Sequence, residues 1–178
     1  MRGKILLTSF QPWLEHHTSN ASDDLLCQLK ARRLAFADFL FLHHLPVETA
    51  IASAKTIQAI AAYQPDLVLC CGMAEKRDRL TVESQAFYQG QQLQTRLDLQ
   101  ALTAPLEFTE ISDDAGKFVC EGLYFQVLKH LQRQQSQART LFLHVPLLTA
   151  ANRPLILRDV ETMLHWLLHN VLAFPIDP

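Results

Sequence analysis

The chain has 178 residues, of which 49% are hydrophobic and 19% charged, so its composition is that of a globular protein and excludes a disordered one. Its formal net charge of -2 gives no electrostatic reason to expect nucleic acid or an anionic membrane surface as a partner. The length suits one domain with a sizeable core, and we expect residues 1–178 to form that single domain.

Apolar runs alternate with helical patterns along the chain. Ser22, Asp23 and Asp24 can cap the first helix, and Pro46 suits the start of the second because its missing N–H costs nothing there. The expected helices cover residues 22–33, 46–63, 120–135 and 155–172, and the expected strands cover residues 4–10, 36–43, 67–71 and 140–145. This alternation predicts an α/β fold in three layers, with a mixed, mainly parallel sheet covered by helices on both faces.

The middle of the chain departs from this alternation. Residues 80–88 and 91–97 flank Gln89-Gly90 and predict a hairpin. Residues 101–105 look irregular, and residues 107–111 predict a short strand. Gly72 follows an expected strand, where we expect a tight turn.

The four cysteines, Cys27, Cys70, Cys71 and Cys120, have neither zinc-ligand spacing nor the pattern of a secreted disulfide framework. Reduced thiols in the cytoplasm are the simplest interpretation. The N-terminal apolar run is too short for a signal peptide, and charged or histidine residues interrupt the longer apolar stretches. We therefore expect a cytoplasmic protein with no membrane span.

One cysteine is a candidate nucleophile. Cys120 lies at the expected start of a helix that follows a turn at Gly116. Unpaired amide hydrogens and the helix dipole favour an anion there, so the thiol would ionise more easily. The alternative is a small buried core residue, which is the commoner fate of a lone cysteine.

Two further residues supply what a cysteine nucleophile needs. His144 lies at the carboxyl end of an expected strand, where catalytic groups of open α/β sheets gather, although it could merely cap that strand. Glu83 lies on an otherwise apolar strand, and it needs a partner such as histidine if it points inward, or none if it points to water. Together they predict a nucleophile, a base and a carboxylate that orients the base.

Other polar clusters carry weaker predictions. The pairs His16-His17 and His43-His44 could suggest a metal, but adjacent histidines on a strand diverge and no nearby carboxylate or cysteine completes a ligand set. We therefore expect no metal site. The charge run 75–79 is typical of a solvated loop.

Several motifs follow one another in an order that resembles the pyroglutamyl peptidase I family, also called pyrrolidone-carboxylate peptidases. They are Ser9-Phe10-Gln11-Pro12-Trp13, then Asn20, Leu45-Pro46-Val47, the ungapped segment from Pro65 to Glu83, the segment Ala115 to Cys120, and Phe142-Leu143-His144-Val145-Pro146. Within the ungapped segment, residues 72–77 align with the family's Gly-x-Ala-Gly-Gly-Arg and residues 81–83 match its Thr-Val-Glu.

The resemblance implies an α/β/α sandwich and removal of an N-terminal pyroglutamyl residue from peptides, with no cofactor. It implies the roles already suggested for Cys120, His144 and Glu83. Phe10, Trp13, Phe118 and Val119 would form the wall of an apolar pocket for the lactam ring. Asn20 is a weaker candidate for contact with the substrate.

The chain also departs from the family pattern. Leu14-Glu15 and Glu75-Lys76 stand where the family has Gly-Gly, so both loops should have changed shape. Glu121 replaces an asparagine and should oppose ionisation of the thiol. The family's oxyanion arginine has no clear counterpart: Leu93 stands at its position and Arg96 is a shifted candidate.

The segment Thr95 to Asp113 is shorter than in the family, so a covering helix should be absent and apolar surface near the hairpin exposed. This predicts a homo-oligomer with a contact there. The first functional hypothesis is a cysteine exopeptidase that acts on pyroglutamyl peptides. The alternatives are a degenerate relative that binds a peptide or partner, and a cysteine amidase with a different substrate.

Overall fold

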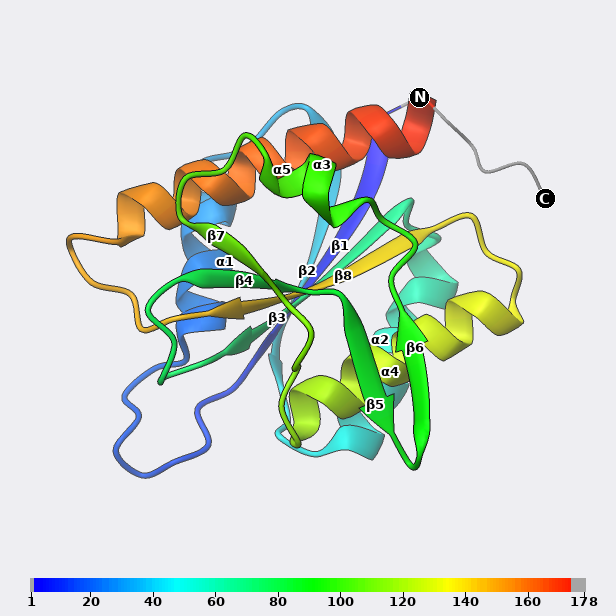
Figure 1. The fold of residues 1–178 in the computed structure, drawn as a ribbon, viewed down its shortest axis with the longest axis horizontal. Helices are drawn as coiled ribbons and strands as arrows, with labels where there is room; N and C mark the ends of the chain where they lie inside the picture. The colour runs from blue at the N-terminus through cyan, green and yellow to red at the C-terminus, as the bar shows by residue number, and fades with distance from the viewer. Residues whose placement is uncertain (1, 174–178) are drawn as a thin grey trace.

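The computed structural model describes residues 2–173 and contains a six-stranded sheet at its centre (Figure 1). Its strands are β1 (Gly3–Phe10), β2 (Ala37–Leu45), β3 (Leu67–Met73), β4 (Leu80–Glu83), β7 (Thr109–Ser112) and β8 (Arg139–Val145). The spatial order is β2-β1-β3-β8-β4-β7. The first four strands in that order are parallel, and β4 and β7 run in the opposite direction. The strand segments at residues 5–8, 39–42, 67–69 and 141–143 therefore lie in one sheet, as predicted.

Helices cover both faces of the sheet. They are α1 (Ala21–Ala31), α2 (Thr49–Tyr63), α3 (Leu99–Thr103), α4 (Val119–Arg133) and α5 (Arg153–Ala173). Helices α1 and α5 lie on one face and α2 and α4 on the other (Figure 1). The predicted α/β/α sandwich with a mixed, mainly parallel sheet is confirmed. Residue 1 and residues 174–178 of the expected domain lie outside the described part.

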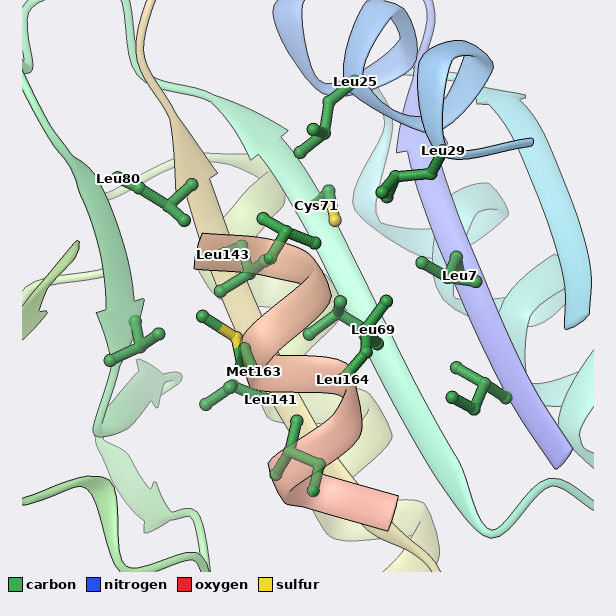
Figure 2. Close-up of a cluster of buried hydrophobic side chains, with 14 of the residues drawn as sticks. Leu7, Leu25, Leu29, Leu69, Cys71, Leu80, Leu141, Leu143, Met163 and Leu164 are labelled. Atoms are coloured by element: carbon green, nitrogen blue, oxygen red, sulfur yellow. The ribbon is translucent and has the colours of Figure 1, made fainter. Parts of the chain in front are cut away.

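The core follows from the alternation of side chains along the strands, because successive residues of a strand point to opposite faces. Figure 2 shows the side between the sheet and α5, where Leu69 and Leu143 meet Met163 and Leu164. Adjacent Cys71 and Cys70 belong to the two different clusters, as expected. Each fully buried leucine contributes roughly 1.5–3 kcal/mol to folding.

Several elements differ from the expectation. Gly72 does not form a turn; it lies within β3 and pairs with His144 of β8. Strand β2 is at the edge of the sheet and is half-buried, because it has a neighbour on one side only. The N-cap of α1 is Asn20, whose side chain accepts the N–H of Ser22, so the aspartates after it occupy the first turn. A short helix, α3, occupies a stretch expected to be irregular, with Asp98 as its N-cap.

The hairpin forms around Gln89-Gly90, as predicted, but it is separate from β4. Strands β5 (Gln85–Tyr88) and β6 (Gln91–Gln94) pair with each other as a two-stranded ribbon that packs on α4. In the described residues, no helix is long and apolar enough to cross a membrane.

Candidate active site

A cavity of about 180 Å³ opens near the carboxyl ends of β1, β3 and β8. Its lining residues are Phe10, Trp13, Asn20, Val47, Met73, Ala115, Gly116, Phe118, Val119, Cys120 and His144. The structure thus brings together every predicted wall residue with the predicted nucleophile and base. Val47 and Met73 were not predicted as wall residues, although Val47 belongs to a motif that carried the family resemblance.

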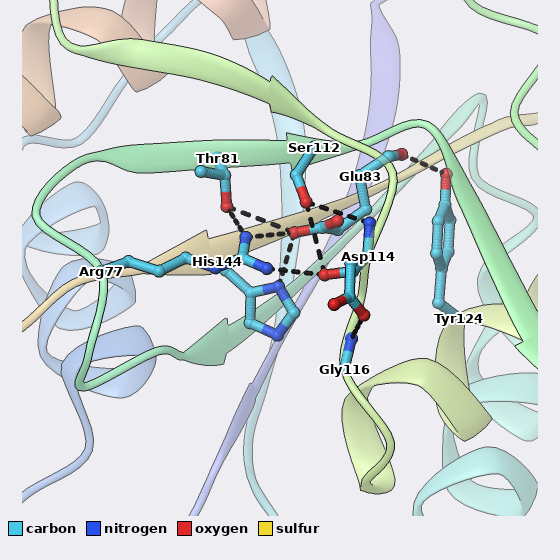
Figure 3. Close-up of polar contacts among 8 residues, drawn as sticks. All are labelled: Arg77, Thr81, Glu83, Ser112, Asp114, Gly116, Tyr124 and His144. Atoms are coloured by element: carbon cyan, nitrogen blue, oxygen red, sulfur yellow. Dashed lines mark hydrogen bonds and ion pairs between the residues drawn. The ribbon is translucent and has the colours of Figure 1, made fainter.

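His144 and Glu83 are held together by the antiparallel pairing of β8 and β4. Thr81 pairs with His144, and Glu83 lies two residues further along β4, so all three side chains share one face of the sheet. The Nδ1–H of His144 donates to Oε1 of Glu83 over 2.7 Å. This bond fixes the ring and leaves Nε2 as the nitrogen that is available to the cavity. Figure 3 shows that second nitrogen pointing away from Glu83.

Glu83 is fully buried, so the alternative in which it points to water does not hold. Burial alone would raise the pKa of its carboxyl group, but the hydrogen bond and charge of His144, with smaller contributions from Ser112 and Arg77, hold that pKa below its ordinary value. Glu83 is therefore a carboxylate at neutral pH. It can stabilise a positive charge that develops on His144.

Arg77 contacts the candidate site, which the sequence interpretation missed because Arg77 was counted among a solvated charge run. Its guanidinium donates to Glu83 Oε1 and Thr81 Oγ1, and to the carbonyl oxygen of Asp114 over 2.6 Å (Figure 3). It therefore ties the carboxylate to the segment that leads into α4. The signal for it was present: Arg77 is the arginine of the aligned Gly-x-Ala-Gly-Gly-Arg motif.

Cys120 is the second residue of α4, as predicted, and Gly116 precedes the helix with a positive φ of 86°. Its sulfur lies directly over Gly72. A Cβ atom placed on Gly72 would be 2.6 Å from Cys120 Sγ and 2.9 Å from Phe142 Cζ. Since Gly72 pairs with His144, the missing side chain at position 72 makes room for the thiol beside the base.

The thiol does not ionise as easily as its helix position alone suggested. Burial, followed by the charge of Glu83, raises the pKa of Cys120 to about 12. The helix start is therefore not sufficient to produce a free thiolate at neutral pH. A nucleophilic Cys120 requires a base that accepts the proton within the site, and His144 is the base that lines the same cavity.

Two contacts fix the position of α4 and hence of Cys120. Tyr124, one helical turn after the cysteine, is fully buried and donates its hydroxyl to the carbonyl oxygen of Glu83 over 3.0 Å. On the side facing α2, a Cβ on Gly122 would be 2.5 Å from Thr49 Cγ2, so glycine permits close helix packing. The helix that carries Cys120 is thus hydrogen-bonded directly to the strand that carries Glu83.

The wall of the cavity has a buried part and an exposed part. Phe10 and Val119 are buried, whereas Trp13 and Phe118 are 48% and 58% exposed, with ring centroids 5.0 Å apart. Asn20 lines the cavity, but its amide caps α1 and donates to the carbonyl oxygen of Gln11. Its polar atoms therefore hold the loop that carries Trp13.

Glu121, which departs from the family pattern, makes a contact that the sequence did not predict. Glu121 accepts the N–H of Phe87 over 3.0 Å and so binds the hairpin to α4, while burial and Glu83 dominate the shift of the thiol pKa. Leu93 and Arg96 line a separate cavity together with Arg139. Neither the ungapped nor the shifted counterpart of the oxyanion arginine therefore lines the cavity of Cys120.

Comparisons with known proteins identify the family of the chain. A family described as pyroglutamyl peptidase matches residues 3–91 and 92–153. A pyrrolidone-carboxylate peptidase of Vibrio vulnificus strain YJ016 is 30% identical over 194 residues, covering 92% of this chain and 89% of the relative. One from Bacillus subtilis strain 168 is 28% identical over 172 residues, covering 82% of this chain and 79% of the relative.

Solved structures show the same fold at lower identity. Pyroglutamyl peptidase I of Bacillus amyloliquefaciens superposes with a TM-score of 0.79 at 21% identity, over 90% of this chain and 94% of that one. A mutant pyrrolidone carboxyl peptidase of Pyrococcus furiosus gives 0.82 at 17% identity, over 94% and 99%. Taken with the match of the family over most of the sequence, these likenesses show that the chain belongs to the pyroglutamyl peptidase family.

Proposed function

We propose that the protein is a cysteine exopeptidase that removes an N-terminal pyroglutamyl residue from peptides, with Cys120 as nucleophile, His144 as base and Glu83 as the orienting carboxylate. One observation carries the proposal. The thiol and the imidazole line one small cavity, and the imidazole is hydrogen-bonded over 2.7 Å to a buried carboxylate. This is the set of groups that nucleophilic acyl transfer requires.

The chemistry proceeds in two halves. Cys120 Sγ forms a bond to the carbonyl carbon of the pyroglutamyl residue while its proton passes to Nε2 of His144. Negative charge develops on the carbonyl oxygen of the pyroglutamyl residue. That oxygen can accept a hydrogen bond from the free backbone N–H of Cys120, which lies in the first turn of α4. The C–N bond then breaks and His144 returns the proton to the leaving amine, which leaves a thioester. Water, deprotonated by His144, attacks the thioester and releases pyroglutamate and the free thiol.

The cavity also suits the acyl group. Its lining contains no aspartate, glutamate, lysine or arginine, and most of it is apolar. A neutral lactam loses little on entering such a cavity, whereas a charged N-terminal amine would lose its hydration without gaining a counterion. We therefore infer a preference for pyroglutamyl over an ordinary N-terminal residue.

The experiment compares turnover of a pyroglutamyl amide with that of the matched prolyl amide, which has the same ring size but carries a charged amine. The unaltered chain should hydrolyse only the first. Cys120→Ala and His144→Ala should abolish turnover, and Glu83→Gln should weaken it, because triad residues act as a unit. Absence of turnover on the pyroglutamyl amide would contradict the proposal.

The second candidate function is that of a cysteine amidase, which uses the same three residues on a different substrate. It is favoured by the exposed aromatic pair Trp13 and Phe118, which leaves the outer part of the cavity open to a different group. Turnover of another small amide in place of the pyroglutamyl one would identify it. Binding of a pyroglutamyl peptide without turnover would instead identify a peptide- or partner-binding relative.

We further propose that residues 1–178 form one domain, that the protein works in the cytoplasm on peptides or small amides, and that it forms a homo-oligomer. The oligomer proposal is supported by Phe87 of β5, which is 46% exposed on the hairpin. An apolar side chain at such a place is a candidate for burial against a second copy. Sedimentation of a monomer at high concentration would contradict the oligomer.

A further inference from the structure

Two loops at the mouth of the active site bring two histidines and a carboxylate together. His16 and His17 follow Leu14-Glu15 in the loop after β1, and Glu75 lies in the loop after β3. These are the two places where the chain departs from the family's Gly-Gly pairs. The sequence excluded a metal because adjacent histidines diverge on a strand and no carboxylate was near. For His16 and His17 neither premise holds, since this pair lies in a turn and Glu75 is folded against it.

The separations between the three side chains suit a metal better than they suit hydrogen bonds. His17 Nε2 lies 3.4 Å from Glu75 Oε2, and His16 Nε2 lies 3.7 Å from Glu75 Oε1. One ligand atom from each side chain lies within 4.8 Å of the others. Ligands about 2.0–2.1 Å from a tetrahedral zinc ion are roughly 3.3–3.5 Å apart, close to the separations seen here.

His17 is the second observation that points to a ligand. Its side chain is only 6% exposed, and neither ring nitrogen has a hydrogen-bond partner within the described residues. A buried imidazole without partners is costly, because both nitrogens lose their bonds to water. Coordination of a cation by Nε2 would remove that cost at one nitrogen.

A second cluster shows the contrast. Asp23, Cys27 and His43 also have ligand atoms within 4.8 Å, but the Asp23 carboxylate already accepts bonds from Ser9 and His43 at 2.6 and 2.8 Å. The Asp23 carboxylate therefore has hydrogen-bond partners without a metal. It serves as an internal control for the first cluster.

We propose that His16, His17 and Glu75 form a binding site for a divalent cation of the zinc class, which joins the two loops at the mouth of the active site. The remaining coordination position is open to solvent or substrate. His17 and Glu75 line a cavity of about 300 Å³ that His144 and Trp13 also line, so the cation lies beside the catalytic groups without using them.

The cation acts on the substrate pocket through Trp13. The Trp13 ring lies 6.2 Å from the His17 ring and 5.0 Å from the Phe118 ring. Fixing His17 to Glu75 therefore restrains the aromatic wall that the substrate contacts. Metal binding should change KM for a peptide amide more than kcat.

The test uses the full chain with Cys120→Ala, because a free catalytic thiol beside a histidine is itself a zinc ligand. The metal-free protein is titrated with Zn²⁺ in competition with a chromogenic chelator, and with Co²⁺ to observe the visible spectrum. We expect one equivalent of Zn²⁺ to bind and Co²⁺ to give the intense visible bands of tetrahedral coordination, without a thiolate band. Zn²⁺ should also raise the melting temperature.

Matched variants locate the site. His17→Ala and Glu75→Gln should each weaken Zn²⁺ binding by at least about tenfold, as expected for loss of a ligand. Glu15→Gln, the neighbouring carboxylate in the first loop, and Cys27→Ser, in the second cluster, should leave it unchanged. Absence of tight binding, or binding that survives His17→Ala and is lost with Cys27→Ser, would overturn the proposal. Melting in the absence of metal shows whether each variant is folded.

Discussion

Replacing Gly72 with alanine tests directly whether the thiol beside His144 depends on the missing side chain of β3. The added Cβ would lie 2.6 Å from Cys120 Sγ and 2.9 Å from Phe142 Cζ, whereas ordinary contacts begin near 3.4 Å. Phe142 is fully buried and cannot move freely, so most of the adjustment must come from Cys120. We expect the sulfur to shift by about 1 Å, a displacement that can lower a rate by about 100-fold.

That loss corresponds to about 2.7 kcal/mol of transition-state stabilisation. The extra methyl group should also lower the free energy of unfolding by about 1–3 kcal/mol, because the site is already closely packed. The assays are kcat/KM on a pyroglutamyl amide and chemical denaturation of the same preparation. The two numbers separate a misplaced nucleophile from a less stable protein.

The matched control is Val160→Ala, on α5, which is fully buried on the opposite face of the sheet. It should cost about 2 kcal/mol of stability by leaving a small cavity, without touching the thiol. Its kcat/KM should remain close to that of the unaltered chain. If Gly72→Ala keeps full activity, or if both variants lose activity equally, the reasoning about Gly72 is refuted.

Three other changes test the surroundings of the triad. Arg77→Gln removes a charge-assisted hydrogen bond worth about 1.5–3 kcal/mol, so kcat/KM should fall by about 10- to 150-fold. Because the loss of this positive charge raises the pKa of Glu83, the acid limb of the pH–rate profile should move to higher pH. An unmoved limb would count against a role of Arg77 in keeping Glu83 ionised. Tyr124→Phe should lower the free energy of unfolding by about 1–3 kcal/mol, since the buried carbonyl of Glu83 loses its partner; unchanged denaturation would contradict this. Glu121→Asn should leave the pH–rate profile in place and reduce protection of the Phe87 amide from hydrogen exchange. A shifted profile would instead show that the charge of Glu121 affects the pKa of the Cys120 thiol.

The same buried carboxylate links stability to pH. The pKa of Glu83 is lower in the folded chain than in the unfolded one, so its contribution to stability is present above the ordinary carboxyl pKa. It is lost as pH falls through the folded pKa. The pKa of Cys120 is raised to about 12, so above the ordinary thiol pKa the unfolded state loses its proton first and stability declines toward that value.

The layers of the fold could be predicted because the pattern of apolar residues reports them locally. Leu67 to Cys71 is apolar at every position since both faces of β3 are covered, and such a run is visible in the sequence. Whether the Glu83 side chain points into the core or to water could not be predicted in this way. It depends on β4 pairing antiparallel with β8, a contact between segments about sixty residues apart.

The residues of the candidate site were predicted from motifs, but their burial, ionisation and contacts were predicted only in part. The helix start at Cys120 is visible in the sequence, whereas the burial and the nearby charge of Glu83 that raise its pKa to about 12 arise only in the folded chain. Arg77 was missed because a charge run does not reveal which member turns inward. Likewise, Glu75 and His17 come together only through the folding of two loops.

The account depends most on His144 accepting the proton of Cys120, because burial otherwise keeps the thiol protonated. The direct measurement is the rate at which low-dose iodoacetamide at neutral pH labels Cys120 and Cys27, followed by mass spectrometry in the unaltered chain and in His144→Ala. Cys27 is exposed on α1 and serves as the reference thiol. We predict that Cys120 is labelled first in the unaltered chain, and that His144→Ala removes this advantage together with turnover of the pyroglutamyl amide. Labelling of Cys120 no faster than Cys27 in the unaltered chain, with no turnover, would contradict the account.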